Sequence, residues 1–160
     1  MKRTIVIVDG MGGGIGTQLI GRIREFLDKD WPGEWDLVAL GTNSAATERM
    51  VKAGAHRGAT GENALKRSVG QGAFILGPVG IVLPNSLMGE ISPAMAAAVL
   101  DAPALRILVP IQQDHFILAG FEPLSLGKMV ERAVEILREK IAAGKKNQAS
   151  GIPWDRGAAQ

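Results

Sequence analysis

The sequence predicts an α/β domain built on a doubly wound, mostly parallel sheet of about five strands, with helices on both faces. Short apolar segments typical of buried strands alternate along the chain with longer segments of helical periodicity. The first three apolar segments each end in a turn that contains glycine. The length of 160 residues suits one domain with a core of ordinary size.

The predicted strands are short and rich in apolar residues. The first, Thr4-Ile5-Val6-Ile7-Val8, is β-branched throughout and apolar on both faces, which indicates a strand inside a parallel sheet. The next three are expected at Trp35–Leu40, Ala73–Leu76 and Leu105–Ile111. A fifth segment, Phe116–Ala119, follows too closely for a crossover helix, so we expect an antiparallel strand at the edge of the sheet. Pro110 fits an edge strand or a strand end.

The predicted helices begin after glycine turns or at capping residues. They are expected over 15–27, from Asn43 or Ser44 to 53, from Thr60 to 69, from Ser92 to 100, and from near Ser125 to Gly144. Ser92-Pro93 is a strong helix start, a cap followed by proline at the first helical position. Residues 94–100 are apolar all round, which predicts burial under the sheet or in a subunit contact. We expect residues 56–61 to form a loop.

Composition excludes several classes of function. The 18 Lys and Arg nearly balance the 16 Asp and Glu, and a net charge of +2 does not indicate nucleic-acid binding. The absence of Cys excludes thiolate catalysis, Cys-ligated zinc and iron–sulfur clusters. His56 and His115 lie far apart in separate loops, so we expect no metal site. No segment is apolar enough for a signal peptide or membrane helix, and we expect a cytoplasmic protein with no membrane partner.

The domain is expected to span residues 1–144, followed by a polar tail over 145–160. In such a Rossmann-like domain, ligands bind outside the carboxyl ends of the strands. Three glycine turns fall there, at 10–16, 41–43 and 77–80. Their backbone N–H groups, together with a helix that starts after Gly14, suit a small phosphorylated ligand. The predicted ligand-binding residues are Gly10, Gly12, Gly13, Gly14, Ile15, Gly16, Thr42, Asn43, Gly77 and Asn85.

The spacing of the first glycine turn, DGMGGGIGTQ, decides between known phosphate loops. It has no lysine, which excludes the loop of P-loop nucleoside triphosphatases, and its glycines do not fit G-x-G-x-x-G. Gly10, Gly14 and Gly16 are similar to the G-x-x-x-G-x-G turn of short-chain dehydrogenase/reductases, which implies a dinucleotide. The chain has no Tyr, however, and therefore lacks that family's proton donor.

The second predicted strand ends in Gly41-Thr42-Asn43, without the carboxylate that would bind an adenosine ribose. This disfavours NAD specifically. Thr42, Asn43 or Ser44 could accommodate a 2′-phosphate instead. The sequence does not identify the cofactor, and NADP and other nucleotides stay open.

Three carboxylates are candidates for acid or base chemistry. Asp9 stands where the first strand meets the glycine turn and could bind Mg²⁺ or attack a phosphoryl group. Phosphatases of that kind carry a second Asp two residues on, where this chain has Met11, so the simpler role of accepting N–H bonds from the loop is favoured. Glu62 and Glu90 each lie next to a glycine in a predicted loop and are candidate general bases. Either could instead serve only to stabilise a helix N-terminus.

Five motifs together resemble an uncharacterised bacterial family, domain of unknown function three-eight-four-two. They are D-G-x-G-G-G-I-G at 9–16, G-T-N-x-x-A-T at 41–47, A-G-A-x-x-G-A-T-G-E-N-A at 53–64, G-P-x-G-I at 77–81 and N-S-x-x-G-E-I-S-P-A-M-A at 85–96. The resemblance covers about residues 3 to 143 and implies that these loops form one constellation. It implies no activity.

Three functions follow from these observations. The first is binding of a nucleotide, dinucleotide or other phosphorylated ligand at the first glycine turn. The second is an enzyme that acts on a phosphorylated or carboxylated metabolite with Asp9, Glu62 or Glu90 as acid or base. The third is a non-catalytic homo-oligomeric assembly or regulatory protein, with the apolar helix at 94–100 and the last helix as candidate contacts between subunits.

Overall fold

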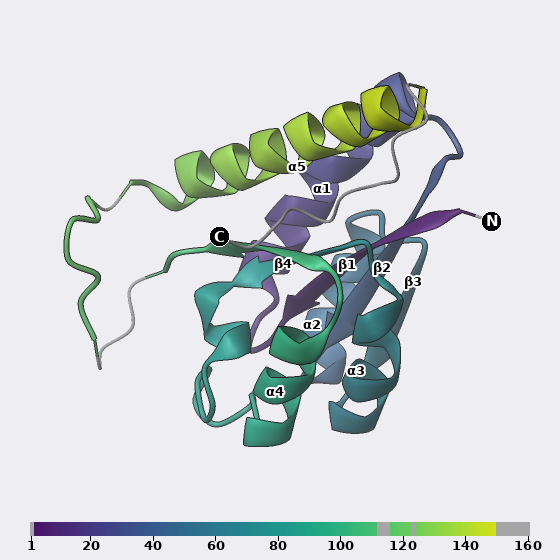
Figure 1. Cartoon of the computed structure of the whole chain (residues 1–160). Helices are drawn as coiled ribbons and strands as arrows, with labels where there is room; N and C mark the ends of the chain where they lie inside the picture. The colour runs from purple at the N-terminus through teal and green to yellow at the C-terminus, as the bar shows by residue number, and fades with distance from the viewer. Residues whose placement is uncertain (1, 112–115, 123, 150–160) are drawn as a thin grey trace.

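The computed structural model describes residues 2–111, 116–122 and 124–149. Its strands are β1 (Arg3–Asp9), β2 (Trp35–Gly41), β3 (Arg57–Thr60), β4 (Phe74–Pro78) and β5 (Leu105–Val109). Its helices are α1 (Gly14–Asp30), α2 (Ser44–Lys52), α3 (Glu62–Ser68), α4 (Pro93–Asp101) and α5 (Leu126–Ala149), with short 3₁₀ turns η1 (Val69–Gln71) and η2 (Val79–Val82). Strands and helices alternate as the sequence predicts, in the arrangement shown in Figure 1.

The five strands form one sheet in the order β3-β2-β1-β4-β5. All four neighbouring pairs are parallel, including the central pair β1–β4, in which Ile7 lies opposite Leu76. The strand order reverses between β1 and β4, because the chain first builds the sheet outward from β1 to β3 and then returns to the other side of β1. The segments that follow β1 and β4 therefore flank the switch point of the sheet.

The prediction of an antiparallel edge strand at 116–119 is wrong. In the described part of this segment Phe116 is a lone bridge position and residues 117–120 form no strand. The fifth strand is β3, at the opposite edge and parallel to β2, within residues 56–61 that we expected to be a loop. Its sequence, Arg57-Gly58-Ala59-Thr60, lacks the apolar run of a buried strand because it is an exposed edge strand. The strand at 105–111 ends at Val109, so Pro110 lies just outside the ladder.

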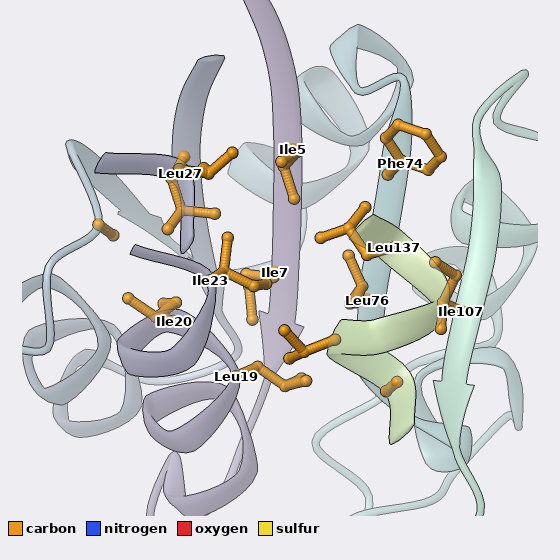
Figure 2. Close-up of a cluster of buried hydrophobic side chains, with 14 of the residues drawn as sticks. Ile5, Ile7, Leu19, Ile20, Ile23, Leu27, Phe74, Leu76, Ile107 and Leu137 are labelled. Atoms are coloured by element: carbon orange, nitrogen blue, oxygen red, sulfur yellow. The ribbon is translucent and has the colours of Figure 1, made fainter. Parts of the chain in front are cut away.

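Two apolar cores cover the two faces of the sheet. On one face, alternate residues of the strands pack against α1, α2 and α5. Figure 2 shows Ile5, Ile7 and Leu76 of this face beside Ile23 of α1 and Leu137 of α5. On the other face, Val6, Val8 and Ile75 pack against α3 and α4. This alternation explains why β1 is apolar at every position from 5 to 8: both of its faces are covered there.

The helix caps were predicted more accurately than the helix ends. The side chain of Asn43 accepts the Ala46 N–H at 2.9 Å, and Ser92 Oγ accepts the Met95 N–H at 3.1 Å. Thr60, in contrast, is the last residue of β3, and Gly61 stands at the cap position of α3. Gly144 does not end the last helix, which continues to Ala149, so the predicted tail is helical at 145–149 and otherwise lies outside the described residues.

The two helices that are candidate subunit contacts bury part of their apolar side chains inside the domain. Met95, Ala96 and Val99 of α4 are buried under the sheet. The stripe along α5 is buried against α1 and the opposite face of the sheet. Leu100 of α4 is 51% exposed, so an assembly interface on this helix stays a prediction. Among the described residues, no helix is long and apolar enough to cross a membrane.

Candidate functional site

The glycine turn after β1 is a tight loop at the switch point of the sheet. Met11 and Gly13 have positive φ angles of 50° and 67°, and the Gly13 N–H donates to the Gly10 carbonyl at 2.8 Å. Only glycine suits position 13, because an added Cβ would also lie 2.9 Å from the Ala46 Cα of helix α2. The loop therefore packs directly on the start of α2 and leads straight into α1.

The side chain of Asp9 fixes this loop through hydrogen bonds. Its carboxylate accepts the Gly10 N–H at 2.8 Å and the Gly16 N–H at 2.7 Å, and also a bond from the Ile15 N–H. The side chain is only 3% exposed, so no external ligand competes for these oxygens. Asp9 thus accepts N–H bonds from the loop, as in the simpler of its two predicted roles. It uses N–H groups at the N-terminus of α1 that were predicted to bind the ligand.

Burial dominates the electrostatics of Asp9. Desolvation raises the pKa of this carboxyl above its ordinary value, and the nearby charge of Glu90 acts in the same direction. The bonds from Gly16, Gly10 and Ile15 lower the pKa but do not overcome burial. The carboxylate is therefore kept in place because the loop N–H groups need an acceptor, rather than because the site favours its charge.

Glu90 closes the other side of the loop and joins three segments. Its Oε2 accepts the Met11 N–H at 2.6 Å and the Thr42 hydroxyl at 2.5 Å. The Asn43 amide nitrogen lies 3.1 Å from Oε1 and 3.2 Å from Oε2, and it also donates to the Met11 carbonyl at 2.9 Å. The segment after β4 thus delivers a carboxylate to the end of β2, where the sequence of that strand supplies none.

The surroundings of Glu90 favour its charged form. Partial burial by itself would raise the pKa, but the bonds from Met11, Thr42 and Asn43 outweigh it and lower the pKa of this carboxyl. Glu90 is therefore an anion at neutral pH, positioned at a half-exposed place where a ligand can reach it.

Replacing Glu90 by glutamine should reveal this charge through the pH dependence of stability. At neutral pH we expect Glu90→Gln to lower the free energy of unfolding by about 1 kcal/mol, because hydrogen bonds to a carboxylate are lost. A lowered folded-state pKa gives stability that is present above the unfolded pKa and is lost as pH falls through the folded one. The difference in Tm between the two proteins should therefore shrink from about pH 5 to about pH 3. The charge of Glu90 is the smallest of the causes that shift the pKa of Asp9, so its removal changes the titration of Asp9 only slightly. A difference that grows on acidification would contradict the assignment.

Arg49 adds a positive charge that the sequence analysis did not single out. It lies on α2, and its guanidinium donates to the Gly12 carbonyl at 2.6 Å. Among the described residues, no carboxylate forms an ion pair with it. No motif spacing marks this arginine, because its place depends on how α2 packs against the loop.

Two residues of the loop, one of them the Gly12 that Arg49 contacts, keep an available backbone N–H group. The N–H groups of Gly12 and Gly14 have no acceptor in the described part of the chain, and both residues are exposed. Among the described residues, a Cβ at Gly14 would meet nothing within 4 Å, so this part of the structure leaves the space above the first turn of α1 open. Of the predicted phosphate donors, Gly12 and Gly14 are therefore accessible, whereas those of Gly13 and Ile15 are used inside the loop.

The remaining predicted residues are placed as follows. Gly77 is buried between strands, where a Cβ would overlap the Val8 carbonyl oxygen. Asn85 is exposed, has a φ of 64°, and donates its N–H to the Ile91 carbonyl at 2.7 Å. Glu62 accepts the Ser92 hydroxyl at 2.7 Å and lies 3.7 Å from Lys66. Gly77 and Asn85 therefore shape the site, and Glu62 stands apart from the glycine loop.

The segment between η2 and α4 carries Glu90 in a strained conformation. Asn85, Leu87 and Met88 all have positive φ, between 52° and 64°, as does Gly89 at 86°. Such angles cost about 1 kcal/mol or more at each non-glycine residue and persist where the surroundings fix them. The Ser86 hydroxyl, which donates to the Gly80 carbonyl, and the Glu90 contacts provide that fixation.

No group of three or more His, Asp or Glu residues within residues 2–111, 116–122 and 124–149 could hold a metal ion. The glycine loop, the end of β2 and the segment after β4 thus meet through Glu90, Asn43 and Arg49. They correspond to three of the motifs that the sequence analysis brought together.

The chain matches one known protein family by sequence. The sequence profile of one family, described as "Domain of unknown function (DUF3842)", matches residues 4–142. The chain belongs to this family. The match covers the whole sheet and nearly all of the helical layers, and it confirms the resemblance drawn from the five motifs. A sequence search of curated proteins finds no match.

Solved structures show the same fold at low sequence identity. UDP-GlcNAc 2-epimerase from Neisseria meningitidis, solved bound to UDP-GlcNAc, is similar with a TM-score of 0.50 and 12% identity over 97% of this chain. An NAD binding oxidoreductase from Klebsiella pneumoniae gives a TM-score of 0.41 and 17% identity over 90% of this chain. This chain spans 40% and 39% of the lengths of those two proteins. The similarity to the first of these structures confirms a Rossmann-like fold for this chain.

Proposed function

We propose that this protein binds a nucleotide or another phosphorylated ligand at the loop between β1 and α1. The observation that carries this proposal is that the exposed residues Gly12 and Gly14 have backbone N–H groups without an acceptor in the described part of the chain, and that the Arg49 guanidinium bonds to Gly12. A guanidinium with adjacent backbone N–H groups at a helix N-terminus is suited to phosphate oxygens. Its place at the switch point of a parallel sheet is where ligands bind in this fold class.

The site accepts a phosphoryl group on one side only. Asp9 and Glu90 already satisfy the N–H groups of Gly10, Met11, Ile15 and Gly16. Two like charges about 4 Å apart repel by about 4 kcal/mol near a protein surface, so a phosphate beside Glu90 is disfavoured. At Gly12 the loop contacts Arg49 instead, and there a phosphate and the guanidinium attract each other. The phosphate position is therefore narrower than the whole glycine loop predicted from the sequence.

Gly14→Asp tests this position without disturbing the fold. The new side chain enters open space at the first position of α1, where an acidic residue stabilises the helix by about 0.5 kcal/mol. Its carboxylate would take the place of the phosphate. We expect the variant to keep or slightly raise the wild-type Tm and to lose at least tenfold in affinity for the phosphorylated ligand. Titrations with NAD⁺, NADP⁺, ATP, coenzyme A and sugar phosphates, followed by thermal shift and calorimetry, provide the measurement.

Gly21→Asp is the matched control. Gly21 lies on the same helix, is also exposed, and a Cβ there meets nothing within 4 Å. It adds the same charge two turns further along α1, so affinity should stay within about twofold of wild type because the field of a surface charge is screened over this distance. A wild-type protein that responds to none of the ligands, or a Gly14→Asp variant that binds as tightly as Gly21→Asp, would overturn the proposed function.

A further inference from the structure

We infer that Glu90 reads the ribose of a bound nucleotide, so that the site selects a free 2′-hydroxyl and rejects a 2′-phosphate. This inference rests on the proposed function and names the class of nucleotide. It differs from the interpretation of the sequence, in which the end of the second strand lacked a carboxylate, NAD was disfavoured and NADP stayed possible. The structure supplies the carboxylate from a different segment, the one after β4.

The place of Glu90 in the fold carries the inference. A ribose hydroxyl is bound in Rossmann-like domains by a carboxylate at the end of the second strand, beside the glycine loop. Glu90 accepts from Thr42 at the end of β2 and from Met11 in the glycine loop. The segment that contains Glu90 follows β4, which lies on the opposite side of β1 from β2. The sequence directly after β2 therefore does not reveal this carboxylate.

The hydrogen bonds of Glu90 leave room for a hydroxyl donor. Oε2 accepts the two short bonds from Met11 and Thr42, whereas within the described part of the chain Oε1 has only the longer contact of 3.1 Å from the Asn43 amide. A carboxylate oxygen can accept two hydrogen bonds, so Oε1 retains capacity for one more donor. A ribose hydroxyl supplies a donor. A phosphate supplies only acceptors and negative charge, which Glu90 repels.

The two halves of the site fit the two halves of a nucleotide. Met11 donates its N–H to Glu90, and the carbonyl of the next residue, Gly12, faces Arg49. One loop therefore separates an anionic position suited to hydroxyl groups from a cationic position suited to phosphate. A ligand with both groups, such as a nucleoside diphosphate, can satisfy both positions at once, whereas an isolated phosphate engages only one.

Paired ligands that differ only at the 2′ position test the inference. Isothermal titration of the wild-type protein with NAD⁺ and NADP⁺, and with ADP and 2′-deoxy-ADP, should show at least tenfold tighter binding of the member with the free 2′-hydroxyl in each pair. Glu90→Gln should weaken NAD⁺ and ADP about tenfold and reduce each preference to below about threefold. Glu25→Gln, an exposed site on α1, is the control and should leave both preferences unchanged.

The outcomes separate this inference from the proposed function. If the wild-type protein binds both members of a pair equally, or if Glu90→Gln keeps the preference, the role of Glu90 in reading the ribose is overturned while phosphate binding stands. If no nucleotide or sugar phosphate binds at all, the proposed function fails and the inference fails with it. The comparison of ligands on wild-type protein does not depend on how well the variant folds.

Discussion

Replacing Gly77 by alanine is expected to lower the free energy of unfolding by about 3 kcal/mol. Gly77 lies in β4, beside the end of β1, and a Cβ there would overlap the carbonyl oxygen of Val8 and lie 3.0 Å from Ile81. The obstructing atom belongs to the backbone of a central strand, so it cannot move aside as a flexible side chain would. Relief requires β1 and β4 to separate at their carboxyl ends. For a chain of this length the corresponding fall in Tm is roughly 6–12 °C.

Gly70→Ala is the control for this prediction. Gly70 is exposed in η1, and a Cβ there meets nothing within 4 Å, so its replacement should change stability by less than about 0.5 kcal/mol. Thermal and urea unfolding of the three proteins provide the measurement. Equal Tm values for Gly77→Ala and wild type would show that the strands can spread at the switch point. The glycine that the sequence assigned to the ligand would then not be required for strand packing.

The order of elements followed from the sequence because each buried strand carries its own signal. The β-branched run at 4–8 and the apolar segments at 35–40 and 73–76 are short, apolar and bounded by turns, and all three are strands in the structure. The edge strand β3 carried no such signal, since three of its four residues are exposed and none has a large apolar side chain. Phe116–Ala119 had the apolar pattern of a strand, but apolar composition does not supply a neighbouring strand with which to pair.

The candidate site was predictable in part. Sequence position placed Asp9, Thr42, Asn43 and the glycine loop at one edge of the sheet, and the structure places them there. It could not show which N–H groups stay free, because Asp9 and Glu90 reach them through side-chain geometry. Arg49 escaped notice for a similar reason: its contact with Gly12 spans 37 residues and depends on helix packing.

Asp9→Ala should be the most damaging substitution in the site itself. The variant removes the acceptor of three loop N–H groups, those of Gly10, Ile15 and Gly16, and two of these residues are buried where water does not replace the carboxylate. Leaving a buried donor without a partner costs about 1–3 kcal/mol, so we expect a total loss of about 3 kcal/mol. The raised pKa of Asp9 shows that its charge is not itself favoured, which assigns this loss to the unsatisfied N–H groups.

Asp9→Asn separates the acceptor from the charge. Asparagine keeps one carbonyl oxygen as an acceptor, but its amide nitrogen is a donor that would face an N–H group. We therefore expect Asp9→Asn to lower the free energy of unfolding by about 2 kcal/mol, less than Asp9→Ala does. Asp101→Ala, at an exposed position at the end of α4, should change stability by less than about 0.5 kcal/mol. If Asp9→Ala unfolds at the same urea concentration as Asp101→Ala, the loop does not depend on this carboxylate. Because the open N–H groups of Gly12 and Gly14 belong to the same loop, Asp9→Ala should also weaken phosphate binding, whereas Asp101→Ala should not.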